Sequence, residues 1–146
     1  RTPDHPAIVD VTGDTTLTWA DVEAATVAEA ARLRAAGVRP GDRVVVRLAN
    51  GAPFCVAVLG AVRADAVAVP IGPVAVPREL EIVFADCTPS IVVAPPDDTD
   101  AAGCAAAVGA ALIGPPELSG RVSDGETVTH GVGGEDIALL VYTSGT

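Results

Sequence analysis

The central part of the chain alternates between short apolar runs and longer mixed stretches. Runs rich in β-branched residues at 43–48, 67–71 and 90–94 have the composition of buried strands. The stretches 50–63 and 77–86 between them have helical lengths, and each carries a proline in its first turn, where a helix tolerates it. This order predicts parallel crossover connections, and therefore an α/β sheet with helices on both faces.

The first part of the chain predicts a hairpin followed by a long helix. Apolar residues at 7–11 and β-prone residues at 15–18 flank a Gly-Asp turn. We expect a helix over 19–36, because Thr18 followed three residues later by Asp21 has the pattern of a capping box.

The ends and the apolar stripe of these helices give further expectations. Gly37 is suited to end the first helix in a left-handed conformation. Asn50 is the expected N-cap of the second helix. Glu29 interrupts the weak apolar stripe of the first helix, which is mostly alanine and so depends on helix propensity and close packing.

The last third is less regular until its final residues. An alanine-rich helix is predicted over 101–111, and 114–134 has the Gly, Pro, Ser and acidic content of an irregular connection. The apolar run 137–142 predicts a buried strand that leads directly into Thr143-Ser144-Gly145-Thr146. Glycine lets backbone N–H groups turn toward an anion and the hydroxyls add donors, so this segment is a candidate phosphate site, although alone it also fits an ordinary turn. It is not a Walker loop.

Composition narrows the class of protein. The 146 residues are about one domain in length, and 49% are apolar, enough to form a core. Nine basic side chains, all arginine, stand against 19 acidic ones, for a net charge of −10. An acidic surface repels phosphate backbones, so we expect no nucleic-acid partner. With no lysine present, chemistry that needs a lysine amine cannot come from these residues.

Cysteine usage and hydropathy indicate a cytoplasmic protein. Cys55, Cys87 and Cys104 form no CxxC pair, and His5 and His130 are far from them in sequence. We therefore expect buried or half-buried thiols in a reducing compartment, and no metal site. No run of 18 apolar residues and no signal peptide are seen, so we expect no membrane association.

Two clusters could suggest other chemistry. Asp97, Asp98 and Asp100 are interpreted as a solvated loop, since nothing in the sequence fixes a metal-binding geometry. The glycines of 131–134 neither follow a clear strand nor open a helix, so the dinucleotide-binding fingerprint fails.

Five segments, in order, resemble the adenylate-forming (AMP-binding) superfamily, which includes acyl-CoA synthetases and peptide-synthetase adenylation domains. These are LTWADV at 17–22, GVRPGDRV at 37–44, NGAPFCVAVLGAVRA at 50–64, VAVP at 67–70 and LVYTSGT at 140–146. The last looks like the opening half of the family's phosphate-loop signature. The resemblance implies the N-terminal subdomain of the acyl-CoA synthetase-like fold, a mostly parallel sheet flanked by helices.

The chain departs from the family pattern at three positions. Arg63 and Asp65 stand where the family has lysine and glycine, and Glu29 stands where it usually has leucine. Aspartate is among the few residues that tolerate a left-handed conformation, so we expect the helix end at Asp65 to be preserved.

The resemblance also implies an activity. An acid-thiol ligase would use ATP, with Mg²⁺, to convert a small carboxylic acid to an acyl-adenylate and would then form a thioester with coenzyme A. By resemblance, Thr143, Ser144, Gly145 and Thr146 hold the β- and γ-phosphates of ATP, and no catalytic or metal-binding residue lies in the chain. Residues 1–146 would be a partial N-terminal AMP-binding domain that ends inside the phosphate loop, without the C-terminal domain, and would be inactive alone.

Other acceptors and a non-catalytic role remain open. Peptide-synthetase adenylation domains usually have Ser where Thr146 stands and Asp where Gly72 stands, which favours a CoA ligase. The alternatives are a peptide-synthetase adenylation domain or a fatty acyl-AMP ligase, either of which loads a carrier protein. A third alternative is a partner-binding domain of the same fold without activity.

Overall fold

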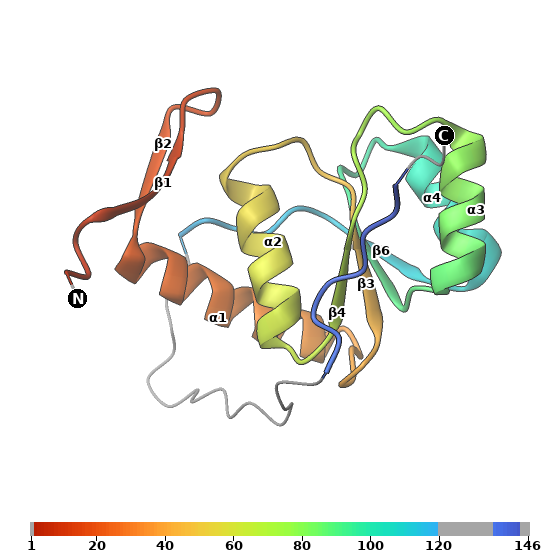
Figure 1. Cartoon of the computed structure of the whole chain (residues 1–146), viewed down its shortest axis with the longest axis horizontal. Helices are drawn as coiled ribbons and strands as arrows, with labels where there is room; N and C mark the ends of the chain where they lie inside the picture. The colour runs from red at the N-terminus through yellow and green to blue at the C-terminus, as the bar shows by residue number, and fades with distance from the viewer. Residues whose placement is uncertain (1, 120–135, 144–146) are drawn as a thin grey trace.

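A computed structural model describes residues 2–119 and 136–143. The chain begins with an antiparallel hairpin and continues as alternating helices and strands (Figure 1). The elements are β1 (Pro6–Asp10), β2 (Thr15–Thr18), α1 (Trp19–Ala35), β3 (Arg43–Val46), α2 (Ala52–Arg63), β4 (Val67–Pro70), α3 (Pro77–Cys87), β5 (Ile91–Val93), α4 (Thr99–Val108) and β6 (Ala111–Ile113).

The main sheet is parallel, with its four strands in the order β4-β3-β5-β6. Figure 1 shows α1 and α2 on one side of this sheet and α3 and α4 on the other. Each strand is connected to the next through a helix, as the alternating pattern predicts. The expected α/β fold is confirmed.

Each face of the sheet has its own apolar core, because successive strand residues point to opposite faces. Val44 and Val46 of β3 face α1 and α2, where Leu33 is fully buried. Val45 faces the other way and packs with Phe84 of α3 and the α4 side chains. Burial on both faces explains why these strands are continuous apolar runs rather than alternating ones.

The hairpin caps the second helix through a side chain distant in sequence. The N-cap of α2 is Gly51, not Asn50 as predicted, and Gly51 offers no side chain. Asp10 of β1 supplies the missing acceptor: its Oδ2 accepts a hydrogen bond from the Ala52 N–H at 2.9 Å. This bond and those from Gly13 and Thr12 outweigh burial and hold the pKa of Asp10 below its ordinary value.

The caps predicted for the first helix are confirmed. The Thr18 Oγ1 accepts a hydrogen bond from the Asp21 N–H at 3.2 Å, and the Asp21 carboxylate accepts from the Thr18 N–H at 2.9 Å. Gly37 follows the helix end with φ of +102°, and Asp65 takes φ of +62° after α2. Aspartate therefore substitutes for glycine at that helix end, as expected.

Glu29 lies inside the contact between α1 and α2 and is only 2% exposed. Its carboxylate accepts two hydrogen bonds from Arg32, at 2.7 and 2.9 Å, and its aliphatic stem lies over Gly60 of α2. Burial raises the pKa of Glu29 above its ordinary value despite the opposing effect of Arg32. The interrupted stripe thus packs because the facing residue has no side chain.

The last part of the regular fold differs from the predictions at both ends of one helix and by one additional strand. Helix α4 begins at Thr99 rather than 101, because Asp98 caps it, and ends before Gly109, which has φ of +73°. Strand β6 pairs with β5 and was not predicted, since residues 111–113 look like the end of an alanine-rich helix.

No helix in the described ranges is long and apolar enough to cross a bilayer.

The predicted buried strand at 137–142 is wrong in extent and burial. This segment forms a single parallel bridge, between Leu139 and Ala68 of β4. Ile137, Leu139 and Val141 are exposed by 68%, 49% and 57%. The apolar run therefore lies along the edge of the sheet rather than within it (Figure 1, blue).

Candidate functional site

A groove of about 460 Å³ lies where the candidate phosphate segment meets the sheet. It is bounded by Ile71 and Gly72 after β4, by Val83 of α3, and by Tyr142 and Thr143. In open parallel α/β sheets, ligands bind outside the carboxyl ends of the strands. The segment beside β4 runs parallel to it, so it leads Thr143 to that edge.

Thr143 is exposed and lines this groove. The other three predicted phosphate-binding residues, Ser144, Gly145 and Thr146, lie outside the described residues, as do His130 and the glycines of 131–134. The predicted phosphate site therefore stays a prediction, and its first residue lies at the edge where the fold would place it.

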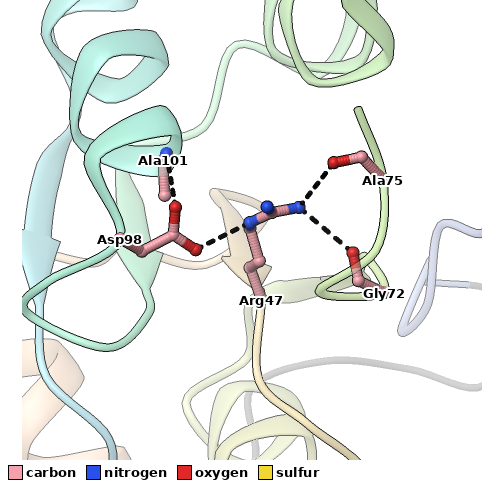
Figure 2. A network of polar contacts seen from close by, with 5 residues as sticks. All are labelled: Arg47, Gly72, Ala75, Asp98 and Ala101. Atoms are coloured by element: carbon pink, nitrogen blue, oxygen red, sulfur yellow. Dashed lines mark hydrogen bonds and ion pairs between the residues drawn. The ribbon is translucent and has the colours of Figure 1, made fainter. Parts of the chain in front are cut away.

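Arg47 organises the loops at the same edge of the sheet (Figure 2). It directly follows β3, and its side chain is only 5% exposed. Its Nε donates to Asp98 Oδ2 at 2.8 Å, and its Nη1 donates to the carbonyl oxygens of Gly72 and Ala75 at 3.1 and 3.3 Å. One guanidinium thus joins the N-terminus of α4 to the β4–α3 loop, which lines the groove.

Asp98 has two partners, one for each carboxylate oxygen. Oδ1 accepts the hydrogen bond from the Ala101 N–H at 2.9 Å that caps α4, while Oδ2 receives Arg47 (Figure 2). Burial acts to raise the pKa of Asp98, but the Ala101 and Arg47 hydrogen bonds outweigh it, and the pKa is lowered.

The interpretation of Asp97, Asp98 and Asp100 as a solvated loop is confirmed only for Asp97. Asp98 is half-buried and paired, and Asp100 is exposed but lies in the first turn of α4. The sequence contained a signal that was missed. Arg47 directly follows the three buried valines of β3, and Asp98 follows the adjacent strand β5. Because the ends of neighbouring parallel strands share an edge, such a pair is placed to meet.

The cysteines are not arranged for chemistry. Cys87 and Cys104 are buried and Cys55 is half-buried, as expected, and none forms a disulfide. Burial raises the pKa of the Cys87 and Cys104 thiols, so they stay protonated and weakly nucleophilic at neutral pH. Among residues 2–119 and 136–143, no group of three His, Cys, Asp or Glu side chains could hold a metal ion.

A second, larger hollow of about 800 Å³ lies near the N-terminus, where Pro3, His5 and Pro6 face Trp19 and Glu23. It is a surface hollow formed by the hairpin and the start of α1. It is not formed at the carboxyl ends of the parallel strands. Position relative to the sheet therefore favours the smaller groove as the functional site.

The fold is that of an α/β protein with a groove at the carboxyl edge of a parallel sheet. The profile of the AMP-binding enzyme family matches residues 1–146. The chain belongs to this family of adenylate-forming enzymes, as the ordered motifs predicted.

Relatives of known function fall into more than one class. The chain is 35% identical to a feruloyl-CoA synthase of Amycolatopsis sp over 135 residues, 92% of this chain and 27% of that protein. It is 34% identical over 149 residues to the AMB antimetabolite synthetase AmbB of Pseudomonas aeruginosa, which covers all of this chain and 11% of AmbB. The chain thus spans about a quarter or less of the length of these relatives.

Solved structures of the same fold include one with the nucleotide bound. The ATP-bound RpMatB-BxBclM chimera B3 superposes with a TM-score of 0.85 at 30% identity, covering 100% of this chain and 30% of the chimera. Apo MatB from Rhodopseudomonas palustris gives a TM-score of 0.81 at 30% identity, over 99% of this chain and 30% of MatB. The N-terminal acyl-CoA synthetase-like fold is thereby confirmed.

Proposed function

We propose that the whole protein activates a carboxylic acid with ATP and transfers the acyl group to coenzyme A. A carboxylate oxygen attacks the α-phosphorus of ATP, and the bond to pyrophosphate breaks. The sulfur of the thiol then attacks the acyl carbon, the thiol proton is lost, and AMP leaves. A carboxylate is a poor electrophile, and the adenylate supplies the leaving group that it lacks.

The observation that carries this proposal is the position of residues 140–143, the described part of the motif that ends at Thr146. Its alignment beside β4 leads Thr143 to the carboxyl edge of the sheet, where the groove begins. Backbone N–H groups and short hydroxyls at such a position suit a polyphosphate, because they neutralise charge without bulk. We propose that Thr143, Ser144, Gly145 and Thr146 bind the β- and γ-phosphates.

Coenzyme A is the preferred acceptor in this proposal. Support comes from feruloyl-CoA synthase among the relatives, and from Thr146 and Gly72, which differ from the usual peptide-synthetase residues. Mg²⁺ would accompany the ATP phosphates. Among the described residues, no group of three His, Cys, Asp or Glu side chains could hold it.

The test is AMP and pyrophosphate release by the full-length protein with a panel of acids. The panel follows the relatives: ferulic acid, a long-chain fatty acid and amino acids such as 3-methylaspartate. We expect acid-dependent pyrophosphate release, and CoA-dependent AMP release with at least one acid. Pure, folded protein that releases no AMP above background with any of these acids would support the non-catalytic alternative.

A carrier protein is the second candidate acceptor, favoured by the 34% identity to AmbB. Both acceptors present a phosphopantetheine thiol, so the adenylation half-reaction is common to both. Adding coenzyme A or a phosphopantetheinylated carrier protein to the same reaction separates the two. If the acyl group is transferred only to the carrier protein, the carrier and not coenzyme A is the acceptor.

A further inference from the structure

The segment that leads into the candidate phosphate site is held to the sheet edge around one residue of β4. The Ala68 N–H donates to the Ala138 carbonyl at 3.0 Å, and the Leu140 N–H donates to the Ala68 carbonyl at 2.9 Å. These two bonds fix the register of the segment at its middle. Thr143 lies three residues beyond the second bond.

Tyr142 makes the next polar contact along this segment, immediately before Thr143. Its hydroxyl donates to Asp86 Oδ2 at 2.5 Å. Its ring and the Leu140 side chain pack against the core between the sheet and α3. The side chains of Ile137, Leu139 and Val141, by contrast, are exposed. Tyr142 therefore holds the part of the segment nearest the groove.

The acceptor of this bond is on a well-held helix end. Asp86 lies in the last turn of α3, and Arg43 of β3 donates from Nε to the Cys87 carbonyl at 2.7 Å and from Nη2 to the Thr88 Oγ1 at 3.0 Å. A hydrogen bond to a carboxylate is shorter and stronger than one between neutral groups. Asp86 thus links the entry of the phosphate segment to the sheet through α3 and Arg43.

The phenol of Tyr142 is protonated at neutral pH and can donate to this acceptor. Burial, and then the hydrogen bond to Asp86, raise the pKa of Tyr142 well above its ordinary value.

We propose that Tyr142 is a positioning residue for ATP, whose hydroxyl, held by Asp86, fixes the backbone at Thr143, the first residue of the candidate phosphate site. This inference rests on the proposed function, since it assigns Tyr142 a part in holding the same phosphates. The alternative is a packing role for the ring alone, with the hydroxyl merely solvated. Tyr142→Phe separates the two, because it keeps the ring and removes only the hydroxyl.

The experiment uses the full-length protein and measures ATP binding by calorimetry and the KM for ATP and for the acid in pyrophosphate exchange. We expect Tyr142→Phe and Asp86→Ala each to weaken ATP binding and raise its KM by about three- to tenfold. The KM for the acid should stay within about twofold, because the hydrogen bond precedes the phosphate segment. Asp86→Asn keeps an acceptor oxygen and should be near wild type.

Two controls distinguish positioning from charge and from folding. Removing an acid near ATP would by itself favour the anionic nucleotide, so Glu81→Ala, an exposed acid on the same helix, should leave the KM for ATP unchanged or lower it. The double variant Tyr142→Phe/Asp86→Ala should be no worse than the more damaging single variant, because the Tyr142–Asp86 bond is lost in all three. The thermal midpoints of the variants should lie close to that of wild type.

The outcomes separate this inference from the proposed function. The positioning role alone would be overturned if wild type binds ATP and Tyr142→Phe binds it with the same affinity. Additive losses of ATP affinity in the double variant would also overturn it. Wild type that binds ATP but activates no acid would overturn the proposed reaction, while the binding data still decide the role of Tyr142. Wild type that does not bind ATP would overturn both.

Discussion

At the scale of single residues, close packing between α1 and α2 depends on an unusual pair. A methyl group at Gly60 would lie 2.7 Å from the Glu29 Cβ and closer still to its Cγ. Real Cβ atoms do not approach so closely, and the stem of a buried side chain cannot easily move aside. Gly60 is therefore required by Glu29 rather than by its own backbone conformation.

Gly60→Ala should consequently destabilise the chain by about 1–3 kcal/mol through overpacking, in spite of the higher helix propensity of alanine. Gly103 of α4 is the matched control, because nothing lies within 4 Å of a methyl group there. Gly103→Ala should stabilise by about 0.5–1 kcal/mol. Urea unfolding of both variants measures the difference, and equal effects at the two positions would contradict the packing argument.

Glu29 also makes stability depend on pH. Its pKa is raised in the folded chain, so the fold favours the neutral acid, and this contribution is complete below the pKa of the unfolded state. It is lost as pH rises through the raised pKa of the folded state. Glutamine stays neutral, so Glu29→Gln should gain unfolding free energy relative to wild type as pH rises above the ordinary glutamate pKa of about 4.3. Denaturation at several pH values tests this, and a difference independent of pH would refute it.

The contact between Glu29 and Gly60 could not be predicted from the sequence. Glu29 is recognisable as an interruption of an apolar stripe, but Gly60 is 31 positions away and its role follows only from the crossing of two helices. The capping box at Thr18 and the helix end at Asp65 were predictable, because both depend on neighbours in sequence. The cap of α2 was not, since it comes from Asp10 of the hairpin.

At the scale of elements, Arg47 joins three parts of the fold: the end of β3, the β4–α3 loop and the start of α4 (Figure 2). Arg47→Leu removes the cation and leaves the Asp98 carboxylate, 16% exposed, without it. Breaking a buried pair in this way costs about 3–5 kcal/mol. We expect such a loss of unfolding free energy in urea.

The controls for this prediction use the same chemistry elsewhere. Arg78→Leu removes an exposed arginine at the start of α3 and should change stability by less than about 0.5 kcal/mol. Asp98→Asn keeps an acceptor for the α4 cap and should cost less than Arg47→Leu. The prediction fails if Arg47→Leu is no more harmful than Arg78→Leu.

Element positions were predictable where periodicity and length agree, as for α1, α2, β3, β4 and β5. The failures have a common physical reason. Strand β6 has only three residues and follows an alanine-rich helix, so its strand state is set by pairing with β5 rather than by propensity. The run 137–142 has the composition of a buried strand, but burial depends on neighbours that periodicity does not reveal.

At the scale of the whole molecule, the order of the five motifs along the chain was more informative than any single motif. The tetrapeptide at 143–146 alone fits an ordinary turn, whereas five motifs in family order identified the AMP-binding enzymes. The structure adds what order does not provide. The segment preceding that tetrapeptide lies at an edge, with three apolar side chains exposed beside β4.

The last prediction concerns residues 1–146 alone. These residues match only 27% of the length of feruloyl-CoA synthase and 30% of MatB, and they include no lysine. To form an adenylate, an enzyme must hold the acid beside ATP and stabilise the charge that develops in the transition state. This positioning and stabilisation provide most of the rate enhancement. We therefore expect the 146-residue chain alone to bind ATP weakly and to catalyse no acid-dependent pyrophosphate exchange, measured beside the full-length protein at equal concentration. Exchange by the short chain above a no-acid control would show that its own residues suffice for adenylation.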